Sequence, residues 1–176
     1  MSDFATCFAF VLENEAGSPP NYAIVPDPTE ADPAAKACAG INSSYFPATF
    51  EWLSQATPAE RPSIIAAFYE ISYFSQWLEQ IPNEIAKRVM DAEVNEGAGI
   101  GVKLLQEAVN SQIVSGPKLA VDGVWGPLTL SAATRVNPDS LLMSFQALRI
   151  ARYQRIAEAN PAEAINLRGW IARAEK

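Results

Sequence analysis

The stretch that decides the architecture is Val121-Asp122-Gly123-Val124-Trp125-Gly126-Pro127-Leu128-Thr129, which follows a segment containing Leu104-Leu105-Gln106. Asp followed by Gly is typical of a tight turn, and proline is favoured at the first position of a helix. The stretch therefore predicts a turn that leads into a helix over residues 128–134, and the preceding apolar pattern predicts a helix over residues 102–110.

Helix signals of the same kind run along most of the remaining chain. Apolar residues recur at helical spacing in four further segments: residues 4–12, 64–78, 85–92 and 141–156. Proline-containing caps precede three expected helices: Thr57-Pro58-Ala59-Glu60, with Pro62 as an alternative start, Asn137-Pro138, and Asn160-Pro161-Ala162-Glu163. A short helix is also expected over residues 49–55. No strand pattern of any length is present, so the sequence predicts a mainly α fold whose last helix opens at residue 160 and ends near residue 173.

Residues 18–48 are the exception to this pattern. They contain six prolines and no apolar periodicity, together with the acidic residues Asp27, Glu30 and Asp32. An irregular segment of this length inside a compact domain is usually functional or mobile. We expect a long irregular loop near the N-terminus, or a small hairpin formed by residues 21–25 and 40–45.

Composition narrows the classes of function. The chain has 176 residues, of which 49% are hydrophobic, and this is enough for a real core. The formal net charge of −7 argues against nucleic-acid binding, which normally uses a basic face. The chain has no histidine, which excludes Ser-His-Asp and Cys-His catalysis and argues against a usual zinc site. Acid–base chemistry is left to Asp and Glu, and no cofactor or metal is expected.

The two cysteines and the apolar runs set further limits. Cys7 and Cys38 are too few for a disulfide framework, so they either pair with each other or stay as two buried thiols. No apolar run reaches the ~20 residues that a membrane-spanning helix needs. We therefore expect no membrane insertion.

Several motifs, taken in order, resemble a known family. Val11-Leu12-Glu13-Asn14-Glu15-Ala16-Gly17 is similar to the L-x-x-E-G-G start of glycoside hydrolase family 108, the phage and bacterial N-acetylmuramidases. The further matching segments are these: Tyr73-Phe74 with Trp77, Ile81-Pro82, residues 91–97, Leu104-Leu105-Gln106, residues 122–129, Arg152-Tyr153, and Gly169-Trp170-Ile171-Ala172-Arg173. The resemblance runs nearly end to end, and it implies a lysozyme-like helical enzyme that cuts the glycan strand of peptidoglycan with Glu15 as its catalytic acid.

The resemblance also implies an organisation and a partner. Residues 1–96 correspond to the muramidase-like catalytic part and residues 97–176 to the peptidoglycan-binding-like part, and we expect the two to pack as one compact body. The implied partner is bacterial peptidoglycan, and we expect a monomer of the endolysin kind. The first residues lack a basic region and a long apolar segment. We therefore expect synthesis in the host cytoplasm without a signal peptide, and action on the cell wall in the periplasm or from outside.

One segment departs from the family pattern. Residues 32–42 stand where the family has D-P-G-G-A-T-N-x-G-I-T, but alanine replaces both glycines and both threonines are lost. This departure motivates a second hypothesis, in which the chain is a non-catalytic peptidoglycan-binding or structural protein derived from such an enzyme.

Cleavage of a glycosidic bond calls for a protonated acid and usually a second carboxylate. Glu15 is expected at the C-terminal end of a helix, where negative charge is unfavourable, and this position suits a residue that must hold a proton. The alternative for Glu15 is a solvated side chain at a frayed helix end. Asp32 is the positional match for the second carboxylate, and Asp27 and Glu30 are rivals in the same loop.

Four other residues are candidates for substrate binding. Tyr45, in the loop, is expected to contact sugar. Asn95 either hydrogen-bonds a loop or a sugar amide, or caps a helix. Asp122 and Trp125 either take part in binding or serve the turn and the core, respectively.

Overall fold

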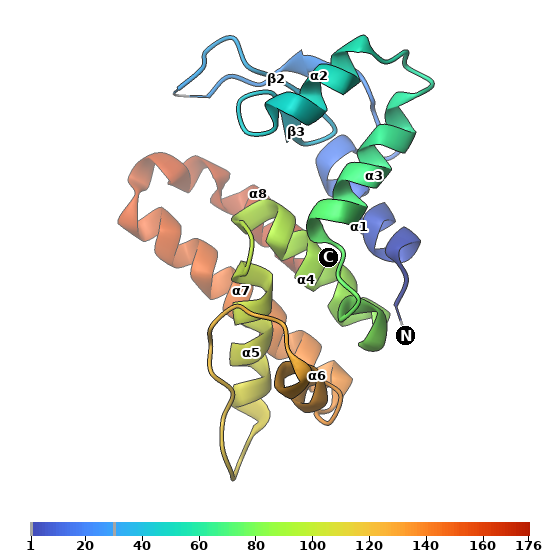
Figure 1. Cartoon of the computed structure of the whole chain (residues 1–176). Helices are drawn as coiled ribbons and strands as arrows, with labels where there is room; N and C mark the ends of the chain where they lie inside the picture. Colours follow the sequence, from blue (N-terminus) through green and yellow to red (C-terminus); the bar gives the residue numbers. More distant parts are fainter. Residues whose placement is uncertain (1, 30) are drawn as a thin grey trace. The chain divides into compact units, whose positions relative to one another are not determined.

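The computed structural model describes residues 2–29 and 31–176 and shows a mainly helical protein, which confirms the predicted fold class (Figure 1). The described residues form two compact units. The N-terminal unit is Phe4–Phe74, and the C-terminal unit contains Ser75–Lys176 together with Ser2 and Asp3. No helix in the described part of the chain is both long enough and apolar enough to span a membrane.

The N-terminal unit combines three helices with a small sheet. Its elements are α1 (Phe4–Ala16), β1 (Val25–Pro26), β2 (Lys36–Cys38), β3 (Ile41–Asn42), α2 (Pro47–Gln55) and α3 (Arg61–Tyr73). The sheet is antiparallel in the order β1-β2-β3, with Val25 opposite Ala37 and Cys38 opposite Ile41. Of the two segments expected to form a hairpin, residues 21–25 reach only Val25 of β1, and residues 40–45 contain β3. These two strands each pair with the intervening β2 and not with one another, and β2 is too short to give an alternating pattern.

The core of this unit lies between α1 and α3, which pack against each other. Val11, Ile65 and Tyr69 are buried there, and the ring of Tyr69 lies 5.6 Å from that of Phe8. The helix α3 ends at Tyr73, before the predicted residue 78, because the backbone is extended at Phe74.

Neither Cys7 nor Cys38 of the N-terminal unit is in a disulfide, and both are buried. The Cys38 thiol donates a hydrogen bond to the backbone oxygen of Tyr22 at 3.3 Å. Burial raises the pKa of this thiol, although the nearby Arg61 charge opposes the shift. The structure therefore corresponds to the alternative of two buried thiols.

The C-terminal unit is built from helices. They are α4 (Asn83–Glu96), α5 (Ile100–Gln112), α6 (Pro127–Ala133), α7 (Pro138–Ala159) and α8 (Leu167–Glu175), with short 3-10 segments at Leu78–Gln80 and Pro161–Asn166. The helix α5 packs on both α4 and α7, and α8 packs on α7 (Figure 1). The predicted boundary between a muramidase-like part (residues 1–96) and a peptidoglycan-binding-like part (residues 97–176) rests on the family resemblance. It stays a prediction.

The caps of the helices explain two details of the fold. The Asn137 side chain accepts a hydrogen bond from the backbone nitrogen of Ser140 at 3.0 Å, so α7 begins where the sequence predicts. Asn160 bonds the backbone nitrogen of Ala162 in the same way at 3.3 Å, but the segment that follows is a 3-10 helix. The prediction of one continuous last helix is therefore wrong, and α8 begins at Leu167.

Candidate functional site

Glu15 lies on the last turn of α1 and faces a pocket of about 330 Å³ in the N-terminal unit. The polar and glycine residues that line this pocket are Glu15, Asn21, Asp27 and Gly40. The remaining lining residues are small or apolar, among them Val25 of β1 and Ala37 of β2. The small sheet therefore forms one wall of the pocket, and the end of α1 supplies its carboxylate.

The turn between β2 and β3 approaches Glu15 closely. Gly40 in this turn has φ +79, and a Cβ atom on it would lie 2.5 Å from Oε2 of Glu15 and 2.6 Å from the hydroxyl of Tyr69. The buried Tyr69 donates a hydrogen bond to the backbone oxygen of Ala39 at 2.8 Å. Only glycine fits here without a shift of these neighbours. The turn therefore packs tightly against both Tyr69 and Glu15.

Of the described acidic residues in the loop, Asp27 lines the same pocket as Glu15. Its Oδ2 accepts a hydrogen bond of 2.7 Å from Nδ2 of Asn42, a buried residue of β3. Its backbone nitrogen donates to the oxygen of Ala35 at 2.9 Å. Asp27 is therefore held in place by the sheet, a relationship that the sequence does not reveal because Asn42 lies fifteen residues further on.

Asp32 is not among the residues that line this pocket. Its Oδ1 accepts a hydrogen bond from the backbone nitrogen of Ala34 at 3.0 Å, and its Oδ2 accepts one from the hydroxyl of Ser44 at 3.2 Å. Both oxygens thus stabilise the loop that leads to β2. Glu30, the third acidic candidate, lies outside the described residues. Tyr45 follows β3 with 69% of its surface exposed, and it does not line the pocket either.

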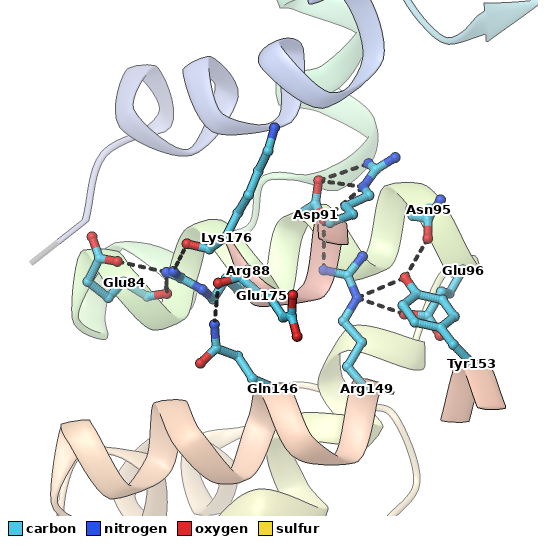
Figure 2. A network of polar contacts seen from close by, with 11 residues as sticks. Glu84, Arg88, Asp91, Asn95, Glu96, Gln146, Arg149, Tyr153, Glu175 and Lys176 are labelled. Atoms are coloured by element: carbon cyan, nitrogen blue, oxygen red, sulfur yellow. Dashed lines mark hydrogen bonds and ion pairs between the residues drawn. The ribbon is translucent and has the colours of Figure 1, made fainter. Parts of the chain in front are cut away.

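A second group of polar residues lies inside the C-terminal unit (Figure 2). Asp91 of α4 is bound by Nη1 of Arg149 from α7 and by Nη2 of Arg173 from α8, each at 2.8 Å. Burial disfavours the charged form of Asp91, but the hydrogen bonds and charges of the two arginines outweigh burial and lower the pKa of this carboxyl. The group ties three helices together.

Asn95 lies one turn further along α4 and joins the same group. The hydroxyl of Tyr153 donates to Oδ1 of Asn95 at 2.6 Å, and it accepts a hydrogen bond from Nε of Arg149 at 2.9 Å. Burial is the main reason why the pKa of Tyr153 is raised. Trp170 stacks on the Tyr153 ring at a centroid distance of 5.3 Å. Residues from three separate sequence motifs therefore meet here, and Asn95 bonds a side chain instead of capping a helix.

Asp122 and Trp125 lie in the turn before α6. The buried Gln106 donates through Nε2 to Oδ1 of Asp122 at 2.8 Å and to Oγ1 of Thr129 at 3.2 Å, and its Oε1 accepts from the backbone nitrogen of Gly123 at 3.0 Å. The hydrogen bond from Gln106 is the main reason why the pKa of Asp122 is lowered. Trp125 is half-buried. Asp122 thus has a structural role in the turn.

The chemistry available to the site in the N-terminal unit is that of carboxylates and amides. Within the part of the chain that the structure describes, no group of three or more His, Cys, Asp or Glu residues is placed to hold a metal ion.

Comparison with known proteins gives a match to a family model and a similar solved structure. Residues 100–175 match a protein family described as "Predicted Peptidoglycan domain". This segment resembles a peptidoglycan domain. The whole fold is similar to the solved structure of SagA from Brucella abortus, with a TM-score of 0.67 and 20% sequence identity over 98% of this chain and 89% of that chain. At this identity the similarity shows the fold alone. No curated protein matches the sequence.

Proposed function

We propose that this protein is a peptidoglycan-degrading muramidase that cleaves the glycan strand by general acid catalysis with Glu15. The observation that carries the proposal is the pocket in which Glu15 and Asp27 lie together, with Gly40 fitted against the Glu15 carboxylate. The similarity of residues 100–175 to a peptidoglycan domain supports the choice of polymer. The place of action is then the cell wall, in the periplasm or from outside.

The two carboxylates have distinct parts in the proposed reaction. Glu15 gives its proton to the glycosidic oxygen as the bond to the anomeric carbon breaks. Asp27, which lines the same pocket and accepts a hydrogen bond from Asn42, stabilises the positive charge that develops on the sugar or takes the proton of the attacking water. We prefer Asp27 to Asp32 for this role, because both oxygens of Asp32 bond the loop.

The alternative function is non-catalytic binding to peptidoglycan by a protein derived from such an enzyme. One specific observation favours it. Ala37, which stands at a threonine of the family pattern, lines the pocket and gives it a methyl group where the resemblance implies a hydroxyl. A missing hydroxyl removes one possible hydrogen bond to water or sugar.

Incubation with purified peptidoglycan decides between these functions. We expect the wild type to release soluble fragments with new reducing ends, identified by mass spectrometry. Glu15→Gln keeps the shape of the side chain but carries no acidic proton, so we expect a loss of about 10²–10⁴-fold in rate. Asp27→Asn should reduce the rate strongly, whereas Asp32→Asn should mainly lower stability.

The opposite outcomes are equally informative. Full activity in Glu15→Gln would remove Glu15 from the role of the acid. A reversed ranking of Asp27→Asn and Asp32→Asn, with both variants folded, would make Asp32 the second carboxylate. Retention of the wild type by peptidoglycan with no release of fragments would leave the non-catalytic alternative.

A further inference from the structure

The C-terminal unit has a pocket of its own, of about 360 Å³, beside the polar group around Tyr153. The residues that line it come from α4, α7, the second 3-10 segment and α8, together with Asn160 between α7 and that segment: Asn95, Glu96, Arg152, Tyr153, Ile156, Asn160, Glu163 and Trp170. Six of these eight residues, all except Asn95 and Glu96, belong to the segment that matches the peptidoglycan domain.

One wall of this pocket is a fixed aromatic pair. The rings of Trp170 and Tyr153 are stacked with an interplanar angle of 25°, and Tyr153 is only 2% exposed. Hydrogen bonds to Asn95 and Arg149 hold the Tyr153 hydroxyl from both sides. Trp170 remains partly exposed. Its ring is therefore held against a rigid base and offers apolar surface and an N–H group to a ligand.

The pocket also offers hydrogen-bond donors that the fold does not use. Arg152 binds Oε2 of Glu96 through its Nε at 2.8 Å, and its side chain is 35% exposed. Asn95 uses its Oδ1 for Tyr153. Among the described residues, the two terminal nitrogens of Arg152 and Nδ2 of Asn95 have no hydrogen-bond partner. A guanidinium with two open nitrogens suits a carboxylate, and an amide N–H suits a carbonyl oxygen.

Negative charge is present at the same pocket. The Oε1 and Oε2 atoms of Glu96 are paired with Arg149 and Arg152, respectively. Glu163 accepts a hydrogen bond from Asn166 through Oε2, and as a carboxylate it can also accept from an ammonium group. The pocket thus presents an aromatic surface, a cation and an anion within one small volume.

We infer that this pocket binds the sugar–peptide unit of peptidoglycan, and this inference rests on the peptidoglycan partner of the proposed function. Such a unit combines an N-acetylated sugar ring with a stem that carries carboxylate and amino groups. The sugar lies against Trp170, a carbonyl oxygen accepts from Asn95, and a stem carboxylate binds Arg152. The pocket beside Asp122 is the rival site, but Asp122 and Gln106 there already bond each other.

Binding is measured on the full chain with Glu15→Gln in every protein, so that the polymer is not degraded. Retention by purified peptidoglycan is followed by sedimentation, and affinity for the soluble probe muramoyl dipeptide is followed by calorimetry. We expect Arg152→Gln and Trp170→Leu to weaken both by about tenfold or more. Trp170→Phe keeps a ring on Tyr153 and should retain most of the binding. Leu128→Ser, at an exposed residue of the rival pocket, is the matched control and should bind like its parent.

Thermal unfolding checks that each variant is folded. If Trp170→Leu does not fold, the single variants Arg152→Gln and Trp170→Phe test whether the pocket binds peptidoglycan. Parental binding in Arg152→Gln, or a loss confined to Leu128→Ser, would overturn the inference. So would equal affinity for muramoyl dipeptide and for an N-acetylglucosamine oligomer that lacks the stem. Release of fragments by the wild type tests the proposed function separately, because cleavage depends on the pocket of Glu15. If fragments are released but these variants bind like their parent, only the inference about the C-terminal pocket fails.

Discussion

Arg149 and Asp91 form an ion pair with 2.8 Å between Nη1 and Oδ2, although their side chains are only 1% and 0% exposed. Charges buried this deeply are costly unless each is paired and hydrogen-bonded. Arg173 meets this condition from α8 by binding the other oxygen of Asp91 at 2.8 Å. The packing of α4, α7 and α8 against one another therefore depends on the carboxylate of Asp91.

Asp91→Asn tests this dependence. The substitution removes one of the two carboxylates that pair with the buried Arg149, the other being Glu96, and it also removes the carboxylate that pairs with Arg173. We therefore expect the free energy of unfolding to fall by about 3–5 kcal/mol. Glu84→Gln is the control, since Glu84 also pairs with a buried arginine, Arg88, but the Glu84 side chain itself is 56% exposed. Because solvent screens this carboxylate, we expect a smaller loss than for Asp91→Asn. Urea unfolding measures both, and equal effects would contradict a special role for Asp91.

The same carboxylate predicts a dependence of stability on pH. The pKa of Asp91 is lower in the folded protein than in the unfolded chain, where it is about 3.9. Its contribution to stability is therefore complete above the unfolded pKa and is lost as the pH falls through the folded pKa. We expect the difference in unfolding free energy between wild type and Asp91→Asn to be constant from pH 7 to about 5 and to shrink below about pH 4. Urea titrations at several pH values measure this difference, and parallel curves down to pH 3 would contradict it.

Gly40→Ala tests the fitted turn beside Glu15. The new Cβ would lie 2.5 Å from the Glu15 carboxylate, so we expect displacement of Glu15 and a loss of peptidoglycan cleavage. Gly17→Ala is a matched control, because Gly17 has a nearly equal φ of +80 but no atom within 4 Å of its Cβ position. Both variants should lose about 1–2 kcal/mol through backbone strain. Only Gly40→Ala should lose more peptidoglycan cleavage than its unfolded fraction explains. Equal cleavage by Gly40→Ala and Gly17→Ala would argue against a close contact between residue 40 and Glu15.

Local sequence signals predicted most of the helices. Proline and asparagine caps and apolar periodicity act within a few residues, and α4, α5 and α7 begin and end close to the predicted positions. The strand β2 escaped prediction because three residues carry no period, and its pairing depends on partners on both sides. The early end of α3 also has no strong local signal, since Phe74 and Ser75 are compatible with a helix.

The candidate sites also differ in whether their features follow from local sequence signals or from contacts between distant residues. The motif around Glu15 placed this residue at a helix end, as the structure has it. Which acidic residue of the loop lies near Glu15 depends on the fold of residues 25–42, so sequence position alone favoured Asp32. The meeting of Asp91, Tyr153 and Trp170 also joins residues that are far apart in the chain. The motifs marked these residues individually, but only the packing of α4, α7 and α8 brings them together.

Gln106→Leu tests whether the Asp122–Thr129 turn depends on one buried amide. Gln106 is 1% exposed, and leucine at this position leaves the backbone nitrogen of Gly123 and the hydroxyl of Thr129 without their partner. We expect a loss of about 1–3 kcal/mol in unfolding free energy, with faster hydrogen exchange at residues 122–129. Gln112→Leu removes a partly exposed amide that bonds Ser144 at 2.7 Å, and it should have a smaller effect. If Gln106→Leu left exchange in the turn unchanged, the turn would be stable by its own Asp-Gly and Pro signals, and the buried amide would not be needed to hold it.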